Sequence, residues 1–152
     1  MKIINIVALC FVMLSLSACP PPPIPPEPVN PVQAELNKNM ALWEHVKPSD
    51  YTYTYKRNCF CPPEEEIIIT ITNGQVTAAF YSPSGTALPP ENFDNLMTIE
   101  KLFQVIQKAI TQEYDRLEVT YNATLGYPEN IVTDPNERAT DLGVGYVVSN
   151  FH

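Results

Sequence analysis

The sequence predicts an α+β domain in which an antiparallel sheet of about six strands carries two helices on one face. Three observations lead to this fold class. Segments of alternating apolar and polar residues occur along the chain, two segments show helical spacing of apolar residues, and an Asn-Gly pair joins two of the alternating segments. Because the chain has 152 residues, it is long enough for one domain but not comfortably for two.

Two segments have the spacing of amphipathic helices. In residues 33–46 the apolar side chains recur every three or four positions: Leu36, Met40, Trp43 and Val46. Pro48 then ends this helix. The second helix follows a candidate N-cap at Thr98, and its apolar residues have the same spacing: Ile99, Leu102, Phe103, Ile106 and Ile110. One face of each helix is therefore expected to be buried.

The clearest strand signal is a hairpin over residues 67–81, which turns at Asn73-Gly74. This dipeptide favours a two-residue type I′ turn. Pairing Thr72 with Gln75 across the turn predicts three apolar pairs on the core face: Ile71 with Val76, Ile69 with Ala78, and Ile67 with Phe80. The remaining strands are predicted at residues 51–55, 116–122, 131–132 and 143–151. The segment 82–95 is rich in Pro, Gly and Asn and is predicted to be a loop.

The first residues have the layout of an exported protein. Residues 1–18 combine Lys2 with a mostly apolar run that is too short for a permanent transmembrane helix, and they predict a signal peptide. Leu16-Ser17-Ala18-Cys19 resembles the bacterial lipoprotein signal. That resemblance implies cleavage before Cys19 and attachment of acyl chains, palmitate among them, to this residue. Several acyl chains anchor a protein more durably than one.

A proline-rich segment follows the predicted lipidation site. Residues 20–31 contain eight prolines in twelve positions, and such a run favours an extended polyproline II stalk. The predicted organisation is therefore a lipidated cysteine and stalk over 19–32 and one folded domain over 33–152. The expected location is the cell envelope. Pro20 in place of aspartate favours the periplasmic face of the outer membrane if the cell is Gram-negative.

The charge balance excludes one class of partner. The chain has 17 acidic and 9 basic residues and a formal net charge of −8. Nucleic-acid binding depends on clustered Lys and Arg, so nucleic acid is not expected as a partner. The expected partners are a membrane, through acyl chains on Cys19, and an unidentified protein or small molecule.

The stretch 51–63 contains most of the candidate functional residues. Tyr51, Tyr53 and Tyr55 share one strand face, where they form either a wall of the core, which is the favoured interpretation, or a stacking platform for sugars or bases. Cys59 and Cys61 are expected to form a disulfide, because side chains two residues apart in a strand share a face and an exported protein meets oxidising conditions. The alternative is a thiol–disulfide redox or metal-binding function of the two cysteines.

The sequence shows no catalytic constellation, since it has only two histidines and no Ser–His–Asp arrangement. A non-catalytic binding module, without cofactor or metal ion, is therefore expected. Asp134, Asn136 and Asp141 lie in one polar segment, but they lack the glycine and distal glutamate of a calcium-binding loop. Turn formation explains these residues better.

Several motifs together resemble a family of uncharacterised bacterial lipoproteins and secreted proteins. They are Tyr-x-Tyr before Cys59-x-Cys61-Pro62, the Asn73-Gly74 hairpin, Tyr121, Gly126-Tyr127-Pro128, Asp134, Asp141 and Tyr146. The family tends to have aspartate where this chain has Asn122. The resemblance covers about Leu42–Phe151 and implies a fold and an exported location, but no activity. The candidate ligand-facing residues are therefore the three strand tyrosines together with Tyr121, Tyr127 and Asp134.

Overall fold

The computed structural model describes residues 30–139 and 141–152. The predicted signal peptide, Cys19 and most of the predicted stalk lie outside the described residues. Within the described part, no helix is both long and apolar enough to cross a membrane.

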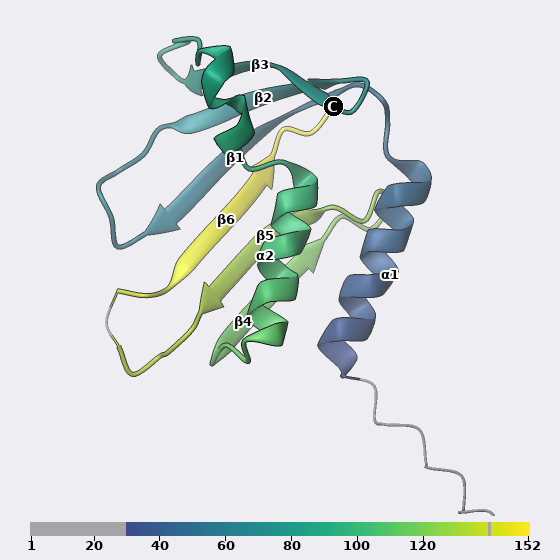
Figure 1. The fold of residues 1–152 in the computed structure, drawn as a ribbon, viewed down its shortest axis with the longest axis vertical. Coiled ribbons are helices and arrows are strands. Elements are labelled where there is room, and N and C mark those ends of the chain that lie inside the picture. The colour runs from purple at the N-terminus through teal and green to yellow at the C-terminus, as the bar shows by residue number, and fades with distance from the viewer. Residues whose placement is uncertain (1–29, 140) are drawn as a thin grey trace, which may run out of the picture.

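A six-stranded antiparallel sheet forms one layer of the domain and two helices form the other (Figure 1). The elements in chain order are α1 (Pro31–Val46), β1 (Tyr51–Cys59), β2 (Glu66–Thr72), β3 (Gln75–Ser82), the 3₁₀ helix η1 (Pro90–Asn95), α2 (Ile99–Thr111), β4 (Arg116–Tyr121), β5 (Pro128–Asp134) and β6 (Val144–Ser149). The strand order is β3-β2-β1-β6-β5-β4. The predicted α+β fold class is confirmed, and the predicted loop at 82–95 contains η1.

The first helix begins at Pro31, inside the range assigned to the stalk. The Asn30 side chain caps it by accepting a hydrogen bond of 2.9 Å from the Val32 N–H. Proline suits the first helical position because the N–H that it lacks would have no partner there. The folded part therefore starts slightly earlier than the sequence suggests.

The buried face of α1 differs from the predicted stripe. Leu36 and Trp43 are buried as expected, but Met40 and Val46 are both 38% exposed. Asn39 is buried in their place, and its side-chain amide donates to the Glu35 carbonyl at 2.9 Å. The prediction was wrong for Met40 and Val46 only. The buried line of the helix runs through Leu36, Asn39 and Trp43, which leaves Met40 beside that line.

A β-bulge corrects the predicted register of the hairpin. Ile71 pairs with Val76 as expected, but the register then shifts, so that Ile69 faces Ala79. The extra residue is Thr77, whose hydroxyl lies 3.0 Å from that of Thr72. Beyond the bulge, Tyr81 takes the core position predicted for Phe80, and Phe80 turns to the uncovered face of the sheet. The sequence could not reveal the shift, because Ala78 and Ala79 are both small and apolar.

An aromatic cluster fills the space between α1 and the sheet. It consists of Trp43, Tyr51, Tyr53, Tyr127 and Phe151. The Trp43 ring meets Tyr51 edge-on with a centroid distance of 5.4 Å, and Tyr127 stacks on Phe151 at 4.5 Å. Such pairs add to the free energy gained by burying their area. This cluster fixes α1 on the sheet.

The second helix follows the prediction closely. The Thr98 hydroxyl accepts a hydrogen bond of 3.4 Å from the Lys101 N–H and caps the helix. The predicted apolar stripe faces the sheet, with four of its members buried: Ile99, Leu102, Phe103 and Ile106. The two helices lie on the same face of the sheet, and their facing sides form a groove.

Candidate functional site

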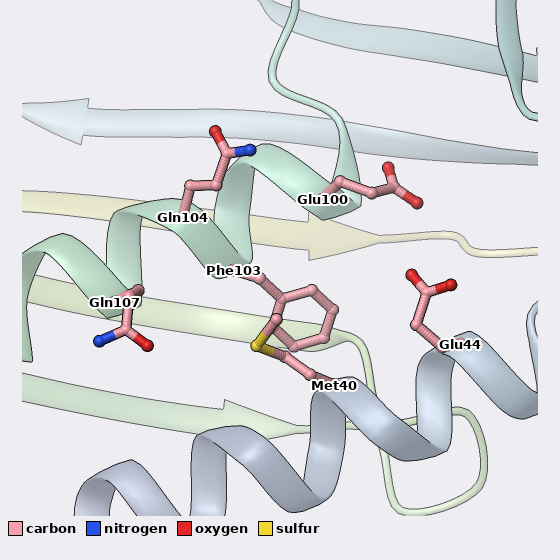
Figure 2. A pocket seen from close by; sticks show the side chains of 6 residues that line it. All are labelled: Met40, Glu44, Glu100, Phe103, Gln104 and Gln107. Carbon is pink, nitrogen blue, oxygen red and sulfur yellow. The ribbon is translucent and has the colours of Figure 1, made fainter.

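A groove between α1 and α2 is the candidate ligand site (Figure 2). Its volume is about 240 Å³. Six side chains line it, the first two from α1 and the others from α2: Met40, Glu44, Glu100, Phe103, Gln104 and Gln107. Because small-molecule sites usually start at roughly 300 Å³, this groove suits one side chain or a small fragment.

The floor of the groove is apolar. Phe103 is buried, and its ring is stacked on Tyr121 with a centroid distance of 6.5 Å. Met40 extends from α1 toward α2, because it lies beside the buried line of its helix (Figure 2). A thioether and an aromatic ring together give a surface that accommodates an aliphatic chain.

One end of the groove is acidic, and Glu44, Lys47 and Glu100 form this acidic end. The Lys47 ammonium lies 2.9 Å from a Glu44 carboxylate oxygen and 3.7 Å from Glu100 Oε1. The same Glu100 oxygen accepts a hydrogen bond of 3.1 Å from the Trp43 indole N–H. Figure 2 shows Glu44 and Glu100 reaching from the two helices toward the same space. One ammonium between two carboxylates leaves this cluster with one net negative charge.

The pKa shifts agree with a negative potential at the acidic end. A hydrogen bond from Lys47 to Glu44, together with the charges of Glu44 and Glu100, raises the pKa of the lysine ammonium. Tyr51 is part of the aromatic cluster, and its pKa is raised by burial first and then by the charges of Glu100 and Glu44. Lys47 therefore remains a cation at neutral pH.

A second hollow also borders the acidic end. It has a volume of about 470 Å³ and is lined by residues of the α1–β1 connection, the hairpin turn and the start of α2: Lys47, Pro48, Ser49, Tyr51, Gly74, Thr98 and Glu100. Glu100 borders both spaces. The two hollows therefore share the acidic end: Glu44 lines the first, Lys47 lines the second and Glu100 lines both.

The candidate tyrosines lie in the core or at its edge. Tyr51, Tyr53 and Tyr55 are all buried, and the Tyr53 hydroxyl donates to the Met97 carbonyl at 2.8 Å. Tyr127 is buried in the aromatic cluster, and Tyr121 is partly buried against Phe103. These residues belong to the wall of the core that the sequence favoured. Tyr51 also lines the hollow beside the acidic end, and Tyr121 lines another hollow between α1 and β4. Their role as ligand-facing residues stays a prediction.

The lining of the groove was not predicted from the sequence. The structure brings Tyr51 and Tyr127 together beside Trp43, which in turn holds Glu100. Polar positions on a helix, such as Glu44 and Glu100, look like ordinary solvated residues in the sequence. The one signal that could have singled out this region is the single tryptophan of the chain, because its indole N–H needs a partner when it is buried.

The cysteine pair lies at the end of β1, away from the groove. The sulfurs of Cys59 and Cys61 are at disulfide-bonding distance, as predicted, and their Cα atoms are 5.2 Å apart. Phe60 between them is 81% exposed. Cys59, Phe60, Cys61 and Pro62 line a shallow hollow of about 320 Å³.

The acidic segment near Asp134 forms turns. A carboxylate oxygen of Asp134 accepts from the Asn136 N–H at 2.9 Å, and the Asn136 side chain accepts from the Arg138 N–H at 3.1 Å. The Asn122 side-chain oxygen likewise accepts from Thr124 and Leu125 in the turn before β5, a role that an aspartate could also fill. Over residues 30–139 and 141–152, no three His, Cys, Asp or Glu side chains come together as metal ligands.

Alkaline pH is expected to destabilise the domain through its buried tyrosines. Burial raises the pKa of Tyr55 and of Tyr121 from 10 to about 12. Between these values the unfolded chain loses protons that the native state keeps, so stability is full below pH 10 and falls from there toward pH 12. Urea denaturation over this range should show the fall, with a smaller slope in Tyr55→Phe. Native tyrosines that all titrate near pH 10 would contradict it.

Comparison with known proteins identifies a family whose function is unknown. Residues 35–152 match the model of a "Family of unknown function (DUF6174)". This agrees with the expected resemblance to an uncharacterised family and extends it over most of α1. No curated protein and no solved structure matches the chain.

Proposed function

The chain belongs to this family of unknown function, and we propose that it is a lipid-anchored bacterial envelope protein that binds a partner in the α1–α2 groove. Membership of the family by itself specifies no activity. The lipoprotein signal ending at Cys19 supports the anchoring. The proposed activity of the folded domain is recognition without catalysis.

The observation that carries the binding proposal is the combination of an apolar floor with a charged end. Phe103 and Met40 offer apolar surface, while Glu44 and Glu100 are held by Lys47 and Trp43. Sites that bind ligands combine an apolar lining with a few placed polar groups in this way. A groove of this composition selects its occupant by shape and charge.

Site-specific photocrosslinking tests the binding site. A photoreactive residue at Gln104, on the exposed rim of the groove, is expected to give an adduct in cells that express the full chain. The same residue at Thr120, on the uncovered face of the sheet, should not give that adduct. Met40→Glu puts a charge into the apolar floor and should remove the Gln104 adduct. Adducts of equal yield from both positions would argue against the groove.

The lipid anchor is tested at Cys19. Metabolic labelling with palmitate should label the natural chain, and the intact mass of the mature protein should correspond to an acylated Cys19 at its N-terminus. Cys19→Ala is expected to abolish the label and to release the protein from the membrane fraction. An unmodified Met1 in the mature protein would contradict the anchor.

The second candidate function is thiol–disulfide exchange at Cys59 and Cys61. The proximity of the two sulfurs next to the exposed Phe60 favours it. Thiol titration and metal analysis of the purified protein separate the two functions. A reactive thiolate or bound metal supports this second candidate, whereas one disulfide of ordinary reducibility without metal leaves groove binding.

A further inference from the structure

We infer that the α1–α2 groove receives a lysine side chain of a partner protein, with the ammonium between Glu44 and Glu100 and the aliphatic stem over Met40 and Phe103. This inference rests on the proposed function, because it names the chemistry of the occupant of that same groove. Four observations support it: the shape of the groove, its uneven polarity, its net charge and the resident lysine.

The shape suits a single unbranched side chain. The groove has a volume of about 240 Å³ and runs between two helices at the surface, with Met40 and Phe103 as apolar lining. This volume is below the usual range for small-molecule ligands. A side chain delivered from outside needs no more than such a surface groove, and a lysine stem buries its methylenes along apolar surface while its head stays polar.

The polarity of the groove gives the occupant a direction. At the end away from Glu44, the Gln107 side chain exchanges two hydrogen bonds of 2.9 Å with that of Gln33. These neutral amides satisfy each other. The carboxylates lie only at the other end, so a cation on an apolar stem has one favourable orientation, with its charge at the acidic end.

The acidic end is short of one positive charge. The ammonium of Lys47 is shared by Glu44 and Glu100 at 2.9 and 3.7 Å. A second cation would neutralise the cluster, and the net charge of −8 of the whole chain favours the approach of cationic partners. A compact ammonium fits here because the resident Lys47 already shows that both carboxylates can share one.

Replacing Lys47 is the most specific test of this inference. If a ligand ammonium binds to the same carboxylates, Lys47 competes with it. Lys47→Gln leaves two carboxylates without their cation, so the affinity for a lysine ligand should rise about fivefold. A merely structural role of Lys47 predicts no gain of affinity.

The experiment uses the full chain and the fluorescence of Trp43, the single tryptophan, whose indole N–H is bound to Glu100. Two probes are titrated: Nα-acetyl-lysine N-methylamide and the matching norleucine compound, which keeps the stem but lacks the ammonium. The lysine probe should bind about fivefold more tightly than the norleucine probe. Glu44→Gln and Glu100→Gln should each remove most of this preference. The amide introduced by Glu100→Gln retains an oxygen that can accept from Trp43, and circular dichroism checks that each variant is folded.

The outcomes separate this inference from the proposed function. Equal binding of both probes overturns the lysine specificity but leaves the groove as a binding site. Absence of binding by either probe up to about 10 mM also overturns the inference, and the Gln104 crosslink then decides whether the groove binds anything. Preference for lysine, increased by Lys47→Gln and lost in the glutamate variants, supports the inference.

Discussion

Replacing Trp43 with alanine is expected to lower the free energy of unfolding by about 4 kcal/mol. The side chain is 0% exposed and makes edge-on contacts with Tyr51, Tyr127 and Phe151. The substitution would leave a cavity between α1 and the sheet, and it would remove the N–H donor of Glu100. The cost therefore combines lost apolar burial, lost ring contacts and a lost hydrogen bond.

Urea denaturation followed by circular dichroism measures this loss, because the variant has no tryptophan fluorescence. Met40→Ala is the matched control on the same helix. Its side chain is partly exposed, so it should cost less than about 1 kcal/mol. If the two variants were equally stable, Trp43 would not be the residue that anchors α1.

Gly126→Ala should be the second most damaging substitution, with a loss of about 3 kcal/mol. Gly126 has a φ of +81°, which disfavours any side chain. An added Cβ would lie 2.6 Å from the Asn39 carbonyl oxygen and 3.2 Å from the Trp43 nitrogen, both in the backbone of α1. Helix backbone cannot move aside without disturbing the aromatic cluster, so the whole helix would have to shift.

The chain contains a matched control for this substitution. Gly85 has a φ of +71°, but nothing lies within 4 Å of an added Cβ. Gly85→Ala should therefore show only the cost of the backbone conformation, about 1 kcal/mol. The difference in unfolding free energy between the two alanine variants measures the close approach of the turn to α1. Equal losses of unfolding free energy in the two variants would mean that the closeness of Gly126 to α1 adds nothing to the cost of the substitution.

Local signals in the sequence were sufficient for most of the fold. Asn73 and Gly74 both have positive φ values, 50° and 73°, as the predicted hairpin turn requires. The cap at Thr98 and the stripe of α2 were also predicted correctly. These features depend on neighbouring residues, and for that reason a single sequence reveals them.

The candidate groove could not be predicted, because it depends on how α1 is rotated against α2. A spacing of three and four residues fits a stripe through Met40 as well as one through Asn39. The close approach of Gly126 to Asn39 is consistent with the second stripe, and no local signal records it. Glu44 and Glu100 belong to different helices, so their meeting at Lys47 is a result of tertiary packing.

The place where α1 begins has a mechanical consequence for a tethered domain. If Cys19 is held in a membrane and the far end of the domain is pulled, tension on the chain enters the fold at Asn30 and acts on α1 first. The load then falls on Trp43 and on the turn at Gly126, which hold this helix against the sheet. Beyond α1 the force would reach β1, which is paired on both sides, with β2 and β6. Stretching would therefore first separate α1 from the sheet, while the paired strands of the sheet would stay together.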